Sequence, residues 1–202
     1  MPQRPPDPRF LKAIRQLGVL RPGDLESHGV PRGYVYRLAR HGLLERIGRG
    51  LYIAEEHGTT ESHSLAMVAK RTPRAVVCLL SALQFHLLTT QLPHEVWIAI
   101  GEKARRPRID YPQLRVMRFS AVTLTAGVEV HEVEGVPVRV TSVAKTVADC
   151  FKYRNKIGLD VALEALRDAW RGRRMTIEEL VRFARLCRVH NVMRPYIEAV
   201  VA

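Results

Sequence analysis

The sequence predicts an α+β protein with an N-terminal winged helix-turn-helix, followed by a mixed α+β domain that ends in a helical bundle. The first 57 residues follow the order helix, helix, turn, helix, hairpin. A polar, turn-rich segment, Glu55–Thr60, comes next, and after it strands and helices are mixed. We therefore expect two domains, 1–57 for DNA binding and 58–202 with the mixed α+β fold.

Each element of the first domain has a local signal in the sequence. Apolar residues at helical spacing predict a helix over Pro8–Leu17, and a proline at an early helical position predicts a short second helix over Pro22–Ser27. His28–Pro31 reads as the turn, and Arg32–His41 as the third helix, stopped by a glycine.

The stretch ERIGRGLY, residues 45–52, predicts the wing as two short strands around a tight turn. We expect Gly48 and Gly50 to supply the positive φ that such a turn needs. Arg49 lies between them at the tip, where Asn or Asp would serve a merely structural turn equally well. A cation at this point is suited to contact the phosphate backbone or the minor groove of DNA.

The third helix is predicted to be buried on one face and basic on the other. Tyr34, Val35 and Leu38 form one stripe, which we assign to the core. Arginines on the opposite side can reach phosphates or the N7 and O6 atoms of guanine, although an ordinary solvated face would have the same pattern. Together with the hairpin arginines, the predicted DNA-binding set is Arg32, Tyr36, Arg37, Arg40, Arg46 and Arg49.

The charge balance favours a polyanionic partner. Thirty-two Lys and Arg residues against twenty Asp and Glu residues give a formal net charge of +12, and nucleic acid is the commonest partner of such proteins. No apolar run approaches the roughly 18 residues that span a bilayer, and the polar, proline-rich start shows no secretory signal. We expect a cytoplasmic protein without a membrane partner.

The second domain is expected to mix strands and helices and to have a helical C-terminal third. Thr176 and Glu179 are spaced as a capping box at the start of one of these helices. The expected elements are helices over 61–71 and 80–88, strands over 75–78, 96–100 and 114–119, a hairpin over 128–140, and helices over 142–153, 159–170, 177–187 and from 193 to the end.

The cysteines predict neither disulfides nor a metal site. Cys78, Cys150 and Cys187 are widely separated, each lies in an apolar run, and none has a CxxC or CxxH neighbour. We expect three small buried hydrophobic side chains and no metal or cofactor.

A catalytic role is not predicted for the second domain. Ser142 and Lys145 match the S-x-x-K pattern of serine acyltransferases, but the partner motifs of that chemistry are missing. Ser142 is a natural N-cap, and Lys145 can pair with Asp149 on the helix surface. His86 ends a largely apolar helix and is interpreted as a hydrogen-bonded structural histidine.

A metal-dependent nuclease would need clustered carboxylates. Glu102 and Lys103 are adjacent, so strand alternation would point them to opposite faces. Glu95 and Asp110 remain as loose candidates, with no ordered spacing. The basic run EKARRPR, residues 102–108, is either a solvated connection or a second contact with a polyanion. Two alternatives therefore stay open for the chain: a transcription factor with a ligand-sensing C-terminal domain, and a nuclease guided by a winged helix.

Three segments in this order resemble AbiEi-type antitoxins of type IV, abortive-infection toxin–antitoxin systems. They are PRGYVYRLARHGLLERIGRGLYIA, LLSALQFHLLTTQLPHEVWIAI and TSVAKTVADCFKYRNKIGLDVALEALRDA, and the resemblance spans roughly residues 8–200.

The resemblance implies a winged-helix repressor of its own operon that binds inverted repeats in double-stranded DNA. It also implies a C-terminal domain that counters a nucleotidyltransferase-like toxin without forming a stable complex with it. The DNA-binding role falls on the arginines named above. The second-domain motif falls on Ser81, Ala82, His86, Thr89, Pro93, Ser142, Lys145, Thr146 and Asp149.

Overall fold

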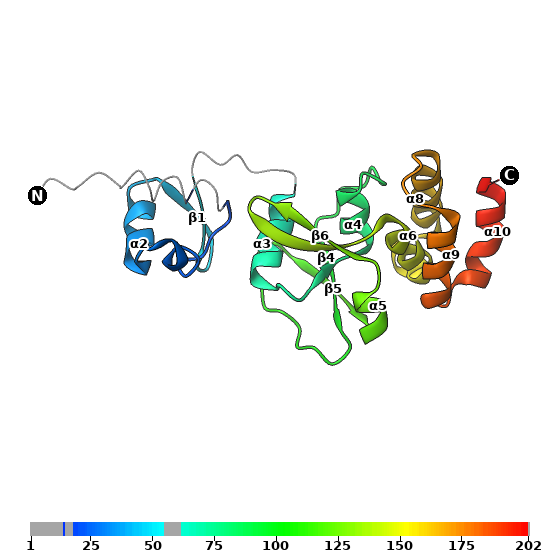
Figure 1. Ribbon diagram of the computed structural model, residues 1–202, viewed down its shortest axis with the longest axis horizontal. Helices are drawn as coiled ribbons and strands as arrows, with labels where there is room; N and C mark the ends of the chain where they lie inside the picture. Colours follow the sequence, from blue (N-terminus) through cyan, green and yellow to red (C-terminus); the bar gives the residue numbers. More distant parts are fainter. Residues whose placement is uncertain (1–13, 15–17, 55–61, 202) are drawn as a thin grey trace, which may run out of the picture. The chain divides into compact units, whose positions relative to one another are not determined.

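The computed structural model describes residues 14, 18–54 and 62–201 (Figure 1). The chain divides into two compact units, the first made of residues 1–73 with 132–138 and the second of 74–131 with 139–202. The predicted domain boundary between residues 57 and 58 lies outside the described residues and stays a prediction.

The first unit contains a helix followed by a hairpin, an order that fits a winged helix. Its elements are the 3₁₀ turn η1 (Glu26–His28), helix α2 (Arg32–Arg40), strands β1 (Leu44–Gly48) and β2 (Leu51–Ala54), and helix α3 (His63–Arg71). The helix predicted over residues 8–17 lies outside the described residues except for position 14, which is helical. The helix-turn-helix therefore stays a prediction.

The prediction of a helix over Pro22–Ser27 is wrong. The segment forms turns and then the single 3₁₀ turn η1. The Asp24 carboxylate accepts a hydrogen bond from the backbone N–H of Arg21 (2.7 Å), and the Ser27 hydroxyl donates to the carbonyl oxygen of Asp24 (2.7 Å). Such short-range bonds between side chains and backbone compete with helical hydrogen bonding.

A small apolar core holds the first unit together. The backbones of Leu20 and Tyr52 hydrogen-bond to each other in both directions (2.8 and 2.9 Å), so the segment before the turns pairs with β2. The buried members of this core are Ile14, Leu20, Leu25, Val30, Val35, Leu38, Leu44 and Tyr52.

Residues 132–138 also belong to the first unit. His63, in α3, lies 2.7 Å from the Glu134 carboxylate, and the backbone N–H of Val19 donates to the carbonyl oxygen of Glu134 (3.2 Å). Gly18 has a φ of +54°, and a Cβ there would stand 1.9 Å from that same oxygen. Only glycine fits this close approach.

A five-stranded sheet, most of it in the second unit, has the strand order β5-β4-β3-β7-β6. Strands β4 and β5 are parallel, as are β3 and β7, while β3 and β4 are antiparallel. The strands are β3 (Val76–Val77), β4 (Val96–Gly101), β5 (Leu114–Phe119), β6 (Val128–Val133) and β7 (Val136–Thr141), close to the predicted ones.

The third of the chain after residue 142 is helical, as expected, and α6 packs against α4, α8 and α9. The Thr176–Glu179 capping box is confirmed, whereas the short helices α5 and α7 were not expected. That the helices form a bundle stays a prediction. The helices are α4 (Leu79–Phe85), α5 (Ala121–Thr125), α6 (Val143–Lys152), α7 (Arg154–Ile157), α8 (Leu159–Arg171), α9 (Ile177–Leu186) and α10 (His190–Val201).

The core of the second unit lies between the sheet and these helices, and it contains all three cysteines. Cys78, Cys150 and Cys187 are free thiols, and their burial confirms the prediction that they are small buried side chains. Burial raises the pKa of each thiol, that of Cys187 to about 12. Among the described residues, none of the helices has the length and hydrophobicity that a bilayer crossing requires.

Candidate nucleic-acid interface

Helix α2 presents the basic face that the sequence predicts. It follows the extended residue Pro31, ends at Arg40 and has His41 as its C-cap. Val35 and Leu38 are buried in the core of the first unit and Tyr34 is half-buried, as expected. The side chains assigned to the opposite face are all exposed: Arg32, Tyr36, Arg37 and Arg40.

Contacts within the first unit position these side chains. The Arg37 guanidinium lies 4.4 Å from the centre of the Tyr34 ring, and the Tyr36 ring meets the Tyr52 ring edge to face at 6.2 Å. Arg32 Nε lies 2.8 Å from the Glu26 carboxylate. Because an exposed ion pair of this kind contributes little to stability, Arg32 can exchange it for a phosphate.

The predicted hairpin is present, with Arg49 exposed at its turn. Gly50 has a φ of +68°, but Gly48 does not have positive φ, so the prediction for Gly48 is wrong. Gly48 pairs with Leu51 after a break in register that leaves Ile47 as an extra residue in β1. This bulge, rather than a second left-handed residue, shapes the turn.

Helix α3 brings further cations to this unit that the sequence analysis did not assign. Lys70 Nζ pairs with the Asp24 carboxylate (2.7 Å), and Arg21 Nη2 donates to the carbonyl oxygen of Lys70 (2.6 Å). Arg71 reaches the hairpin turn at Arg49. No sequence signal marks these cations, because basic residues in the last turn of a helix are ordinary.

The motif residues of the second unit form a buried polar network. His86 Nε2 lies 2.7 Å from the carbonyl oxygen of Thr141, and Thr146 Oγ1 donates to that same oxygen (3.0 Å). The backbone N–H of Trp97 donates to Ser81 Oγ (2.9 Å). These bonds tie α4 and α6 to the sheet.

The position of His86 fits the structural role interpreted from the sequence. Because a carbonyl oxygen only accepts, Nε2 carries the proton in the bond to Thr141. Burial lowers the pKa of the His86 imidazole below its ordinary 6.5, so the ring is neutral at physiological pH.

Lys145 and Asp149 were expected to pair on the helix surface, and the expected surface location is wrong. The two side chains do pair, but they are 0% and 1% exposed. The Cys187 thiol donates to the other oxygen of Asp149 (3.3 Å), and the Phe119 ring lies 4.9 Å from Lys145 Nζ. Burial raises the pKa of Asp149, and the Lys145 ammonium opposes this rise. The sequence shows the i, i+4 spacing but not that α8 and α9 pack against α6.

The remaining motif positions include Ser142, at the start of a helix, and Thr89 and Pro93, in a loop. Ser142 is at the N-cap of α6 as predicted, but the prediction that it caps is wrong, because its hydroxyl makes no capping bond and has no partner among the described residues. Thr89 Oγ1 accepts from the backbone N–H of Gln91 (3.2 Å), and Pro93 is half-buried.

Within the described part of the chain, no three His, Cys, Asp or Glu side chains gather in a way that could hold a metal ion. Glu95 lies 4.0 Å from Arg115, and Glu102 and Asp110 are exposed. The carboxylates considered for a nuclease are therefore not assembled with others into such a group.

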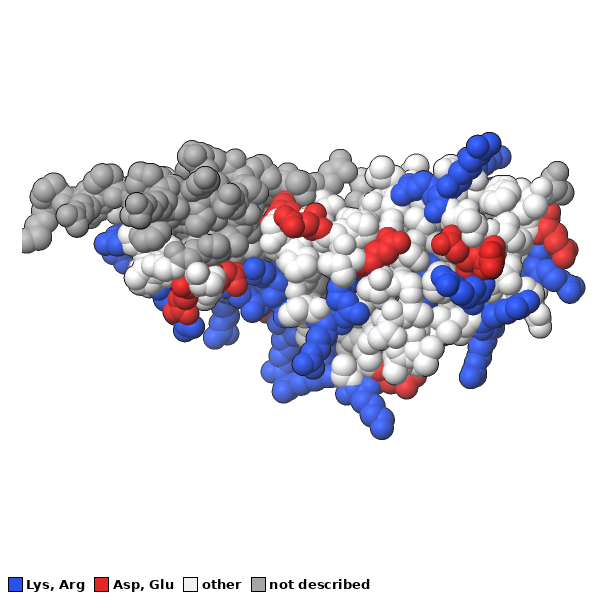
Figure 2. Space-filling model, viewed as in Figure 1, with Lys and Arg blue, Asp and Glu red and all other residues white. Residues whose placement is uncertain are grey.

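Lys and Arg side chains of the second unit gather around the loop that follows β4 (Figure 2). Lys103, Arg105, Arg106 and Arg108 are exposed. Arg118 Nη1, in β5, donates to the carbonyl oxygens at the start of this loop, including that of Ala104 (3.0 Å). The loop is thus held at its start, and its contact with a polyanion stays a prediction.

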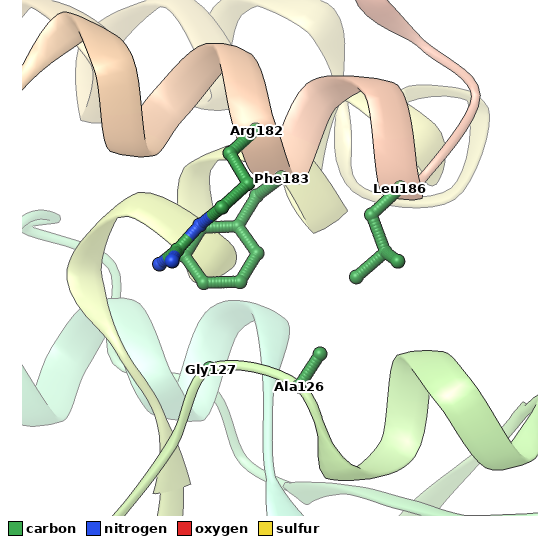
Figure 3. Close-up of a pocket in the computed structure, with 5 residues that line it drawn as sticks. All are labelled: Ala126, Gly127, Arg182, Phe183 and Leu186. Atoms are coloured by element: carbon green, nitrogen blue, oxygen red, sulfur yellow. The ribbon is translucent and has the colours of Figure 1, made fainter.

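A pocket of about 390 Å³ lies between α9 and the turn before β6. Ala126 and Gly127 form one wall, and Phe183 and Leu186 point toward them from α9 (Figure 3). The Arg182 guanidinium lies 4.7 Å from the centre of the Phe183 ring. Apart from this cation the lining is apolar, without the convergent polar groups that usually fix a small-molecule ligand. The ligand-sensing alternative stays a prediction.

The comparisons with known proteins concern the first unit. Residues 10–54 match the family model of the AbiEi antitoxin transcriptional regulators. No curated protein matches the chain. The match covers the third predicted helix and the hairpin, but none of the second-domain motif. Over residues 10–54 the chain is thus similar to the AbiEi antitoxin family of transcriptional regulators, which confirms the resemblance to an AbiEi-type antitoxin.

Proposed function

We propose that this protein is a DNA-binding repressor and antitoxin of a type IV toxin–antitoxin system. It binds inverted repeats in its own operon through a winged helix-turn-helix and counters a nucleotidyltransferase-like toxin through its second domain, without a stable complex. It acts in the cytoplasm and has no catalytic activity. The family match supports the regulatory and antitoxin parts of this proposal.

The basic face of α2 carries the DNA-binding proposal. Arg32, Arg37 and Arg40 are exposed above a buried apolar stripe, and Arg49 is exposed on the following hairpin. In a winged helix, such a helix enters the major groove and the hairpin lies along the backbone or in the minor groove. Arginine is the side chain best suited to both contacts, because its guanidinium binds guanine and phosphate in bidentate geometry.

The second domain would protect through surfaces other than its motif side chains. His86, Lys145, Thr146 and Asp149 are buried and hydrogen-bonded to one another or to the sheet. They stabilise the fold that presents an outer surface to other molecules. The pairing of the Lys145 ammonium with Asp149 supports such a structural role.

The full chain should bind DNA with strong salt dependence. Fluorescence anisotropy would measure its affinity for a duplex from upstream of its own gene and for an unrelated duplex at several salt concentrations. Arg49→Ala should weaken binding to both duplexes alike, since it removes a backbone contact. Arg37→Ala or Arg40→Ala should reduce discrimination between the two by about 1–3 kcal/mol, the size of a bidentate base contact. Affinity that is absent or insensitive to salt contradicts the proposal.

A further inference from the structure

Arginine side chains from two elements meet at the turn of the β1–β2 hairpin. Arg46, in β1, donates from Nε to the carbonyl oxygen of Gly48 (3.3 Å). Arg71, the last residue of α3, has its Nη2 atom 3.5 Å from the carbonyl oxygen of Arg49. Arg49 is itself exposed at the turn. Two of these guanidinium groups thus contact backbone carbonyl oxygens of the turn, and the third is the side chain of a turn residue. Arg71 joins them although it is far from the others in the sequence.

The missing side chain of Gly48 makes room for Arg71. A Cβ at Gly48 would stand 2.5 Å from Arg71 Nη2, closer than Cβ atoms come to their neighbours in real structures. The backbone does not require glycine here, because Gly48 does not have positive φ. A Cβ at this position would first meet the flexible end of the Arg71 side chain, which would have to move away from the turn.

Residues other than Arg71 also hold α3 to the rest of the first unit. Lys70 Nζ pairs with the Asp24 carboxylate, and the carbonyl oxygen of Lys70 accepts from Arg21 Nη2. The charge of Lys70 is thereby neutralised. By contrast, no carboxylate forms an ion pair with Arg46, Arg49 or Arg71 among the residues that the structure describes.

Three guanidinium groups that pair with no carboxylate in the described part of the chain are suited to bind a phosphate. Each has five N–H donors, and Arg46 and Arg71 each direct one of them to a backbone carbonyl oxygen. The other donors match the oxygens of a phosphodiester. The carbonyl contacts also restrict the two side chains, which lowers the entropy lost on binding.

We propose that Arg46, Arg49 and Arg71 together form a binding site for the phosphate backbone of DNA, and that α3 is therefore part of the DNA-binding surface. This inference rests on the proposed function. It extends that function to a helix outside residues 10–54, the segment that the family model matches.

The test measures binding of the full chain to the upstream duplex and to an unrelated duplex of equal length. Arg71→Ala should lower the affinity for both duplexes by the same factor and reduce the slope of log K against log salt by about 1. Arg71→Lys should retain the slope, because it keeps the charge. Arg185→Ala, which removes an exposed arginine of α9 in the second unit, is the matched control and should change neither quantity.

Gly48→Ala tests the placement of Arg71 without changing any charge. Its Cβ should displace the Arg71 guanidinium and weaken binding to both duplexes, but it should have no further effect in an Arg71→Ala background. Circular dichroism would verify that each variant is folded. If Arg71→Ala perturbs folding, Gly48→Ala and Arg71→Lys decide the question.

Two outcomes separate this inference from the function on which it rests. If the wild type binds DNA with salt dependence and Arg71→Ala behaves like Arg185→Ala, the phosphate site is wrong and the proposed function stands. If the wild type shows no such binding, both are wrong. A loss confined to the upstream duplex would assign Arg71 to a base and overturn the phosphate site.

Discussion

Lys145 and Asp149 place an ammonium and a carboxylate inside the second unit, where neither group meets solvent. Taking either charge out of water is costly, and each one compensates the other only while both are present. The thiol of Cys187 adds a hydrogen bond to the carboxylate. The pair is thus a point where one substitution leaves a buried charge without its counterion.

We expect Lys145→Met or Asp149→Leu alone to reduce the free energy of unfolding by about 3–5 kcal/mol, the usual effect of breaking a buried pair. Both substitutions together should cost less than either one, because the double variant buries no charge. Urea unfolding of the full chain would measure these changes.

The exposed pair Arg194–Glu198 in α10 is the matched control, with the same i, i+4 spacing and side chains that are 68% and 71% exposed. Arg194→Met and Glu198→Leu should each change stability by less than about 1 kcal/mol, as exposed pairs usually do. Equal effects at the two pairs would contradict the argument from burial.

Among the elements, the turn that connects α5 to β6 packs closely against two helices. Gly127 has a φ of +62°, and a Cβ there would stand 2.6 Å from Cζ of Phe183 in α9 and 2.9 Å from Cβ of Lys145 in α6. Its carbonyl oxygen also accepts from the backbone N–H of Ser142 (2.8 Å). One glycine therefore allows three elements to come together.

Gly127→Ala should be strongly destabilising, because it combines two costs. A left-handed conformation costs a residue with a Cβ about 1–2 kcal/mol, and overpacking a core adds about 1–3 kcal/mol. Thermal or urea unfolding would measure the total.

A Phe183→Leu background should reduce the cost of Gly127→Ala, since the obstructing ring is then absent. At Gly29, which is also left-handed with a φ of +74° and a ψ of 15°, no atom lies within 4 Å of the place a Cβ would take. Gly29→Ala should therefore show the backbone cost alone. If Gly127→Ala were no worse in the wild-type background than with Leu at 183, the packing argument would fail.

For the whole molecule, the division into two units predicts that repression and protection from the toxin are separable. Replacing Arg32, Arg37 and Arg40 together by Ala changes only exposed positions of the first unit, so stability should change little. This variant should lose repression of a promoter–reporter fusion. Expressed from a foreign promoter, it should still rescue cells from the adjacent toxin.

The outcome that contradicts separability is a variant that is folded by circular dichroism, fails to repress and also fails to rescue. Protection would then require DNA binding. A converse variant at Lys145 and Asp149 cannot serve as the partner experiment, because both side chains are buried and their loss would test stability. Exposed positions of the second unit have to be used instead.

The sequence by itself determined most of the helices and strands, and it determined the part of the candidate site that α2 and the hairpin contribute. The amphipathic pattern of α2, the hairpin around Arg49 and strand β5 over Leu114–Phe119 agree with the structure. These features depend on interactions between residues close together in the chain, where periodicity, capping and turn propensity act. The helix predicted over Pro22–Ser27 is absent, because short-range hydrogen bonds at Asp24 take the place of helical ones.

Only the tertiary structure decided which groups lie together and which are buried. It placed the Arg71 guanidinium at the hairpin turn, beside Gly48. It also put Lys145 and Asp149 in the core. The physical reason is that burial and proximity depend on how distant segments pack, whereas the i, i+4 spacing of a charged pair is the same on a surface and in a core.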